Sequence, residues 1–288
     1  MGGARGRRLR MTTSKIPSGA RSVITGAGSG FGRAVSLALA ERGARLLLSD
    51  VSKEGLAESV SMARGKGAQI ESMIVDVRDA AQIEGMAKRA EEMWGGVDVL
   101  VNNAGVAVAG EVGSIPLDDW KWQVDINLWG VIYGCHYFVP KMKAHKSGWI
   151  LNVASIAGVV SAPMMGPYNV TKAGVIALSE TLATELATSG IKVTALCPSF
   201  FRTNIHKGSR ATGMLTGRTE KLVTQSKWSA EEIAEHALRG LERGQLYVMP
   251  QSDAKAMWRL KRALGGGFFG AIGAAAKRGV LDRVMGRD

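Results

Sequence analysis

The sequence predicts an α/β fold in which about seven parallel strands form one sheet with helices on both faces. Short apolar runs of strand length alternate with helix-length segments, and polar residues or glycines follow the runs. This alternation is typical of parallel sheets, because each crossover between neighbouring strands needs a helix. The expected strands are 22–25, 45–50, 69–76, 97–102, 149–154, 192–197 and 245–249. Functional residues are expected at the carboxyl ends of these strands.

The first expected strand is followed by a glycine-rich segment, 25–32, and then by a helix-length segment. Its glycines have the spacing Gly-x-x-x-Gly-x-Gly. Glycine allows a tight turn and lets the backbone approach a pyrophosphate, which binds the N–H groups of the following helix. Glycine also serves ordinary turns, but its position between a strand and a helix indicates a dinucleotide site. The predicted contacts are Gly26, Ser29, Gly30, Phe31 and Gly32.

Asp50 ends the second expected strand. A carboxylate there accepts hydrogen bonds from an adenosine ribose and repels a 2′-phosphate, so Asp50 favours NAD over NADP. The alternative is an aspartate that caps the next helix. Both roles are open from the sequence.

Tyr168 and Lys172 are four residues apart and share one face of an expected helix. A nearby ammonium favours the phenolate, so Lys172 is expected to lower the pKa of Tyr168 from its usual value of about 10. Such a phenol exchanges a proton with an alcohol or ketone. Ser155 lies upstream in the same region. The alternative is an ordinary solvated helix face.

With these motifs the chain resembles the short-chain dehydrogenase/reductase family, in its single-domain branch, over residues 17–250. The resemblance rests on segment 25–32, Asp76, the Asn-Asn-Ala-Gly run at 102–105, Asn127, and Ser155 with Tyr168 and Lys172. It implies a Rossmann-type doubly wound parallel sheet. It also implies that Tyr168 is the general acid/base and that Ser155 hydrogen-bonds the substrate oxygen.

The same resemblance implies further roles. Lys172 would lower the pKa of Tyr168 and bind the nicotinamide ribose, and Asn127 would hold a water that relays protons. Asp76 and Val77 would contact the adenine. The cofactor cleft would be lined by Asn103, Ala104 and Gly105.

A family motif after the sixth strand, Pro-Gly-x-x-x-Thr, is altered in this chain. Pro198 and Thr203 are in place, and Thr203 would contact the nicotinamide carboxamide, but Ser199 replaces the glycine. How closely this turn approaches the nicotinamide is therefore open. A helix over 117–143 is expected to carry Asn127, and one over 168–189 the catalytic pair.

Residues 199–228 are expected to form a substrate lid, because they combine glycines with many serines and threonines. The lid is rich in basic residues and also contains apolar ones. Phe200 lies within it, and Met164 and Met165 lie just before Tyr168, where the family places substrate contacts. These residues suit a small hydrophobic alcohol or ketone. The four histidines lack metal-ligand spacing, so no metal site is predicted.

The formal net charge of +12 is concentrated in the two tails. Residues 1–16 are expected to form a basic disordered arm, and residues 251–288 a basic amphipathic extension. This extension packs either on protein or, as a peripheral contact, on an anionic membrane surface. No nucleic-acid partner is expected, because no reader motif accompanies the basic residues. The two cysteines, Cys135 and Cys197, lie in expected core elements and favour a cytoplasmic location.

Together these features predict an NAD-dependent oxidoreductase that interconverts a hydrophobic secondary alcohol and its ketone by hydride transfer. Two alternatives are an NADPH-linked carbonyl or 3-oxoacyl-type reductase and a non-catalytic dinucleotide-binding interaction protein. The resemblance further implies a homo-oligomer, a tetramer or dimer, built through the two long helices.

Overall fold

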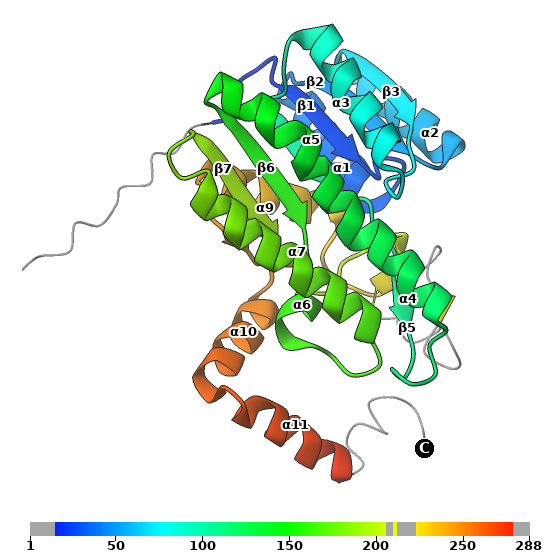
Figure 1. Cartoon of the computed structure of the whole chain (residues 1–288), viewed down its shortest axis with the longest axis vertical. Helices are drawn as coiled ribbons and strands as arrows, with labels where there is room; N and C mark the ends of the chain where they lie inside the picture. Colours follow the sequence, from blue (N-terminus) through cyan, green and yellow to red (C-terminus); the bar gives the residue numbers. More distant parts are fainter. Residues whose placement is uncertain (1–14, 206–209, 212–222, 279–288) are drawn as a thin grey trace, which may run out of the picture.

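A single parallel sheet runs through the middle of the molecule (Figure 1), in the strand order β3-β2-β1-β4-β6-β7-β9. The structure is a computed structural model that describes residues 15–205, 210–211 and 223–278. The strands are β1 (Arg21–Thr25), β2 (Arg45–Asp50), β3 (Ile70–Ile74), β4 (Val99–Asn102), β6 (Gly148–Val153), β7 (Ile191–Leu196) and β9 (Tyr247–Val248). All seven expected strands are therefore confirmed. The greatest differences are at β3 and β9, each three residues shorter than predicted.

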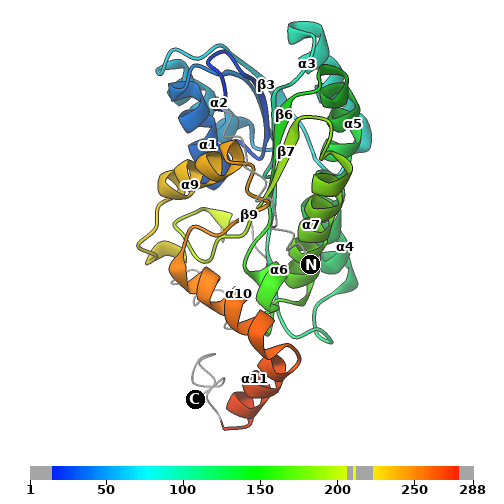
Figure 2. The same ribbon diagram turned by 90° about the vertical axis from the view of Figure 1, so that its left-hand side faces the viewer.

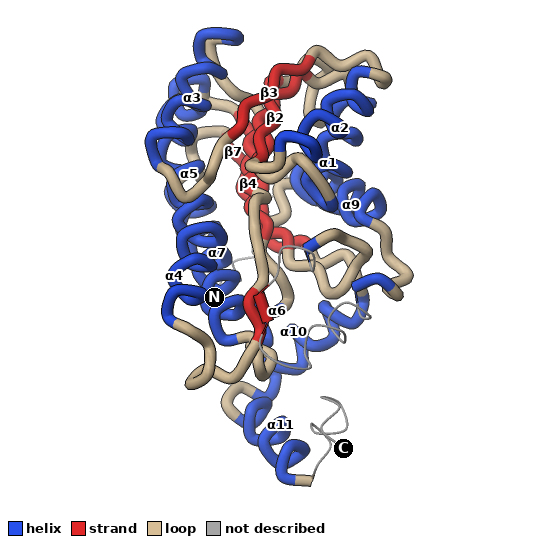
Figure 3. Tube along the Cα trace, turned by 90° about the vertical axis from the view of Figure 1, so that its right-hand side faces the viewer, coloured by secondary structure: helices blue, strands red, loops and turns tan. Residues whose placement is uncertain are grey.

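Helices cover both faces of the sheet, as Figures 2 and 3 show. One face carries α1 (Gly30–Glu41), α2 (Lys53–Arg64) and α9 (Ala230–Glu242). The other carries α3 (Ala80–Trp94), α5 (Gly130–His145) and α7 (Gly166–Glu185). The doubly wound α/β architecture predicted from the sequence is thus confirmed.

Alternate residues of each strand enter opposite cores, because successive side chains of a strand point to opposite faces. On β2, Leu46 and Leu48 pack in the core that contains Leu39 of α1, whereas Leu47 packs with Phe138 of α5. Both faces of the central strands are buried, which is why their sequences read as continuous apolar runs.

The order of the sheet reverses between β1 and β4, which are hydrogen-bonded neighbours. Connections from β1 lead toward β2 and β3, and those from β4 lead toward β6 and β7. The segments that leave the carboxyl ends of β1 and β4 therefore diverge and leave a crevice, the usual ligand site in this type of sheet.

The expected helix over 117–143 is interrupted. It consists of α4 (Leu117–Val124), a π-helical segment (Asp125–Trp129) and α5, which ends at His145. Asn127 lies in the π-helical segment, a feature that often occurs at functional sites. The expected helix over 168–189 is α7, which begins two residues earlier and ends at Glu185.

Two further features were not predicted. A small parallel sheet pairs β5 (Val108–Ala109) with β8 (Arg210–Ala211). Ile16, predicted to belong to the N-terminal arm, is buried in the core, and its N–H donates to Glu242. The packed part of the chain therefore begins before residue 17, while residues 1–14 of the predicted arm lie outside the described residues.

Beyond β9 the chain forms α10 (Ser252–Leu264) and α11 (Gly267–Lys277), which lie past the short helix α6 (Ala157–Val160) and away from the sheet (Figure 1). In the part of the chain that the structure describes, no helix combines the length and apolar character needed to cross a membrane.

Candidate active site

The glycine turn between β1 and α1 is packed so closely that side chains would not fit. Gly26 has φ +65°, and a Cβ there would lie 2.7 Å from Cα of Ala104. A Cβ on Gly32 would lie 2.0 Å from the carbonyl oxygen of Gly26. The side chain of Ser29, which precedes α1, forms no capping hydrogen bond with the N–H groups of the first turn of this helix within the described part of the chain. Both positions therefore require glycine for the turn to pack, and the turn leads directly into the N-terminus of α1, whose first N–H groups fit a pyrophosphate.

Amide hydrogen bonds fix this turn to the end of β4. Nδ2 of Asn103 donates to the carbonyl oxygens of Thr25 and Gly26, at 2.9 Å in each case. The hydroxyl oxygen of Thr25 accepts from the N–H groups of Asn103 (3.0 Å) and Ala104 (3.2 Å). Thr25 was not predicted as a site residue, although its position at the start of the glycine motif was a usable signal.

Asp50 points its carboxylate at the glycine turn. Its Oδ2 accepts from the N–H of Gly28 at 2.8 Å, and its Oδ1 accepts from the N–H of Ser52 at 2.9 Å. The cap of α2 is Ser52, whose side chain accepts from Gly55. The alternative that Asp50 caps this helix is therefore wrong, and the contact of its carboxylate with an adenosine ribose stays a prediction.

The predicted adenine contacts lie at the end of β3. Asp76 forms an ion pair with Arg78, which holds the pKa of the Asp76 carboxyl below its ordinary value. The side chain of Val77 is buried, and a Cβ on Gly130 would lie 2.9 Å from it. Val77 thus packs against α5, and the adenine contact stays a prediction for both residues.

Three predicted catalytic side chains meet between β6 and α7. The side chain of Ser155 lies beside the Tyr168 hydroxyl and favours its ionised form, and Oγ of Ser155 accepts from the N–H of Ala157 at 3.1 Å. Lys172 is buried, and its Nζ lies 5.6 Å from the centroid of the Tyr168 ring. Nζ also donates to the carbonyl oxygen of Val153 at 2.7 Å. The three residues form one connected group.

Loss of water decides the acidity of this group. Burial raises the pKa of Tyr168 to about 12, and the side chain of Ser155 acts in the opposite direction. Burial lowers the pKa of Lys172 to about 8. For the protein by itself, the expectation that Lys172 brings the pKa of Tyr168 below its usual value is therefore wrong, because desolvation of the phenolate outweighs the opposing effect of Ser155.

Asn127 is fully buried beside this group. Its Oδ1 accepts from the N–H of Val106, and its Nδ2 donates to the carbonyl oxygen of the same residue, both at 2.8 Å. A Cβ on Gly105 would lie 3.4 Å from Oδ1 of Asn127 and 3.5 Å from Nζ of Lys172. Asn127, Gly105 and Lys172 thus converge on one point, as the relay prediction requires, although the relay itself stays a prediction.

The segment after β7 lies over the glycine turn. A Cβ on Gly30 would lie 2.6 Å from Oγ1 of Thr203, and the ring of Phe31 meets that of Phe201 edge-on, with centroids 6.4 Å apart. The carbonyl oxygen of Pro198 accepts from the N–H of Ile156, close to Ser155. Pro198 and Thr203 therefore border the same crevice as the turn.

Ser199, which replaces the family glycine, has partners beyond β9. Its N–H donates to Oε1 of Gln251 at 3.1 Å, and its hydroxyl oxygen lies 3.2 Å from Oδ1 of Asp253 on α10. The amide of Gln251 in turn donates to the carbonyl oxygen of Phe200. The departure from the family motif thus ties this turn to the C-terminal extension.

The predicted substrate residues belong to a layer beyond the sheet. Met164 has φ +65°, a strained backbone conformation for a residue with a side chain, and its carbonyl oxygen accepts from the N–H of Gly110 at 2.8 Å. Met165 pairs with Gly110 in a parallel bridge. Phe200 is exposed. These positions are compatible with substrate contacts, which stay a prediction.

On the opposite edge of β5, Arg210 of β8 forms an ion pair with Asp119 at 2.7 Å, and its guanidinium lies 3.9 Å from the ring of Trp122. These contacts were not predicted. Much of the expected lid, residues 206–209 and 212–222, lies outside the described residues.

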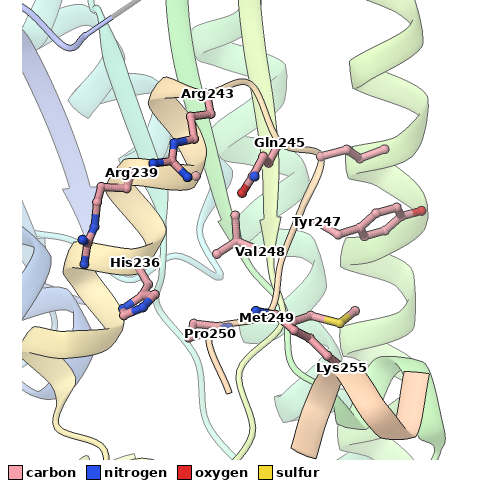
Figure 4. Close-up of a pocket in the computed structure, with 11 residues that line it drawn as sticks. His236, Arg239, Arg243, Gln245, Tyr247, Val248, Met249, Pro250 and Lys255 are labelled. Atoms are coloured by element: carbon pink, nitrogen blue, oxygen red, sulfur yellow. The ribbon is translucent and has the colours of Figure 1, made fainter. Parts of the chain in front are cut away.

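A separate groove of about 570 Å³ lies between α9 and β9 (Figure 4). Basic side chains line it, namely His236 and Arg239 of α9, Arg243 just after this helix, and Lys255 of α10. No residue predicted for catalysis or cofactor binding is among its described lining residues. Within the described residues, no group of three or more His, Cys, Asp or Glu side chains could hold a metal ion.

Sequence comparison decides the family. The family model described as short chain dehydrogenase matches residues 21–213. The chain is a short-chain dehydrogenase/reductase. SadH of Mycobacterium tuberculosis, named as an oxidoreductase, is 32% identical over 265 residues, which cover 89% of this chain and 95% of the relative. The 3-oxoacyl-[acyl-carrier-protein] reductase FabG of Thermotoga maritima is 36% identical over 63% of this chain and 74% of its own length.

A solved short-chain dehydrogenase/reductase has the same fold. The enzyme from Burkholderia phymatum, in complex with NAD, has a TM-score of 0.82 and 31% identity, with coverage of 87% of this chain and 95% of that one. The predicted family and fold are therefore confirmed, and membership of this family makes the protein an oxidoreductase.

Proposed function

We propose that this short-chain dehydrogenase/reductase uses NAD to interconvert a hydrophobic secondary alcohol and its ketone. The observation that carries the proposal is the connected group of Ser155, Tyr168 and Lys172 beside the crevice. A phenol, a hydroxyl and a buried cation at one point can exchange a proton with a carbonyl or hydroxyl oxygen and stabilise charge on it.

The proton chemistry follows from the two shifted groups. With a pKa of about 12, Tyr168 is protonated at neutral pH and is able to donate to a ketone oxygen as that oxygen gains negative charge. Lys172, with a pKa of about 8, is mostly charged at neutral pH and stabilises the phenolate left behind. Ser155 orients the substrate oxygen. In the direction of oxidation the same phenol oxygen receives the hydroxyl proton.

The residues present fit a dinucleotide. The glycine turn would hold the pyrophosphate, and Asp50 would hold the adenosine ribose. Lys172 and Thr203 would hold the nicotinamide end. When bound, the nicotinamide accepts or supplies the hydride. The choice of NAD is supported by the Asp50 carboxylate, which is held at the N–H of Gly28. This carboxylate is negative, so it would repel the 2′-phosphate of NADP. The NAD complex of the Burkholderia relative agrees with this choice.

The similarity to FabG favours a second candidate, an NADPH-linked reductase of 3-oxoacyl or other carbonyl substrates. One assay separates the two. The wild-type enzyme is given each coenzyme with secondary alcohols and ketones of increasing chain length, and absorbance of the reduced nicotinamide is followed. We expect NADH to form from long-chain secondary alcohols at neutral to mildly alkaline pH. Turnover with NADP(H) alone would reject the NAD proposal in favour of the second candidate.

We also infer that the enzyme is a homo-oligomer, a dimer or tetramer built through α5 and α7. Trp129, just before α5, and Val170 on α7 are exposed large apolar side chains at that surface. Light scattering coupled to gel filtration should give a mass above that of one chain, and Val170→Glu should lower it. A monomeric wild type would contradict this inference.

A further inference from the structure

The C-terminal helices α10 and α11 extend from the body beyond the carboxyl ends of the strands (Figures 1 and 2). One side of α10 holds it to the protein. Ala254 is fully buried, and the Trp258 ring lies 5.8 Å from that of Tyr247. Nζ of Lys261 donates to the carbonyl oxygen of Val159 on α6. These residues recur at helical spacing and account for one face of the helix.

A second face of α10 is apolar and exposed. Met257, Leu260 and Leu264 are 42%, 51% and 48% exposed, and Phe269 of α11 is 43% exposed. Residues 267–276 of α11 contain no charged side chain, and most of the described ones are exposed. A helix that is apolar all round is normally covered. These four large side chains, with the surface of α11, are called the tail face below.

The tail face is accompanied by positive charge. Between residues 252 and 278 the sequence has six basic residues and one acid, Asp253. The basic residues are Lys255, Arg259, Lys261, Arg262, Lys277 and Arg278. Among the described residues, none of these six forms an ion pair. Lys255 also borders the basic groove of Figure 4, so the positive surface continues onto α9.

The positive charge of the tail face favours an anionic lipid surface over a second copy of this chain as its binding partner. Two copies of this chain that met through their tail faces would bring the same uncompensated charges together, in a chain of net charge +12. An anionic lipid surface offers both apolar depth and negative charge, and helices with one apolar and one basic face are bound by it. We propose that α10 and α11 form a docking surface for an anionic lipid bilayer.

This surface adjoins the crevice. Ser199 is bonded to Gln251 and Asp253, and α10 packs beside α6, which directly follows Ser155. If the proposed function holds, a lipid-soluble alcohol would leave the bilayer next to the segment that borders the nicotinamide. Docking itself requires neither coenzyme nor substrate.

The test is co-sedimentation of the full-length protein with vesicles. One set contains phosphatidylcholine alone, and the other contains phosphatidylcholine mixed with phosphatidylserine. We expect binding to the second set at physiological salt and a strong loss of binding at high salt. Failure of the wild type to sediment with the anionic vesicles would overturn the proposal, whatever the outcome of the alcohol assay.

Two double variants separate the apolar and the charged contributions. Leu260→Gln with Leu264→Gln should lower the partition coefficient by roughly tenfold or more. Arg259→Gln with Arg262→Gln should lower it by roughly 25-fold, because each basic residue near a lipid surface contributes about a fivefold factor.

Matched controls lie at the other end of the molecule (Figure 1). Met62→Gln with Ile74→Gln removes apolar side chains of similar exposure, 44% and 54%. Lys53→Gln with Arg64→Gln removes exposed charges of α2. Both controls should bind as the wild type does. If the controls lose as much binding as the tail variants, or if the tail variants alter only the oligomeric mass, the tail face is not a lipid surface and the proposal fails.

Discussion

The two sides of the crevice are held in different ways. On the cofactor side, the glycine turn, Asn103 and Asp50 are joined by hydrogen bonds in which at least one partner is backbone. On the substrate side, Arg210 contacts Asp119 and Trp122, and Ser199 contacts Asp253, through side chains. The cofactor-side bonds need only this turn with an aspartate and an asparagine at two strand ends, whereas the substrate-side contacts join side chains from separate segments of this chain. Cofactor handling should therefore be general, and substrate selection should be particular to this protein.

Between the two sides lies the proton-transfer group, and removing it gives the largest expected effect. Tyr168→Phe deletes the hydroxyl that carries the proton, so kcat should fall by roughly 10³-fold. The cofactor side does not depend on that hydroxyl, so NAD binding measured by fluorescence should stay close to the wild-type value. Tyr137→Phe on α5 is the matched control and should keep full activity. Retention of turnover by the Tyr168 variant would refute the role of this residue.

The cofactor side is tested at Asp50. Asp50→Ala removes the charge that would repel a 2′-phosphate and one charge-assisted hydrogen bond, so the NAD/NADP ratio of kcat/KM should fall by roughly 10- to 100-fold. The control Glu54→Gln removes an exposed acid from the first turn of α2 and should leave the ratio unchanged. An equal ratio in the Asp50 variant and the wild type would contradict the ribose role.

The cofactor side was largely predictable from the sequence. Strand ends mark the carboxyl edge of a parallel sheet, so Asp50 and Asn103 could be placed without coordinates. The glycine spacing predicted a tight turn, which the close packing at Gly26 and Gly32 confirms. The helix-cap alternative for Asp50 was settled only by geometry, because Asp50 and Ser52 are both good capping residues at adjoining positions.

The substrate side was predicted less well, for physical reasons. The pairing of β5 with β8 joins residues about a hundred positions apart through two-residue strands, which carry no periodicity. The π-helical segment at Asn127 has the composition of an ordinary helix. The pKa of Tyr168 was predicted in the wrong direction, because spacing reveals the neighbouring cation but not the loss of water around the phenol.

The buried cation gives a prediction about stability. The pKa of Lys172 is about 8 in the folded protein against 10.5 ordinarily, so between these pH values the unfolded chain binds a proton that the folded chain has released. The contribution of Lys172 to stability should therefore rise with pH in this window, by up to about 1 kcal/mol per pH unit. The raised pKa values of Cys135, Cys197 and Tyr168 act in the opposite direction above their ordinary values of 9.0 and 10.0, so the Lys172 contribution is measured as a difference from a variant that lacks this amine.

Urea unfolding of the wild type and of Lys172→Met at pH values from 8 to 10 measures this contribution, because the variant lacks the titrating amine. The wild type should gain stability relative to the variant as the pH rises. Lys53→Met, on the surface of α2, should follow the wild type. Parallel curves for the wild type and the Lys172 variant would contradict the shifted pKa.

The smallest effect is expected on the substrate side, at Arg210. Its side chain holds β8 against α4, and β8 pairs with β5, which is followed by Gly110, bonded to the loop before Tyr168. Because the ion pair with Asp119 is exposed, Arg210→Ala should raise KM for the alcohol by only roughly three- to tenfold and leave kcat and KM for NAD nearly unchanged. Arg210→Lys keeps the charge but loses the planar contact with Trp122. Its KM for the alcohol should therefore lie between those of the wild type and Arg210→Ala. A fall in kcat at unchanged KM would place Arg210 with the proton-transfer group instead of the substrate side, and the division between the two sides would then be wrong.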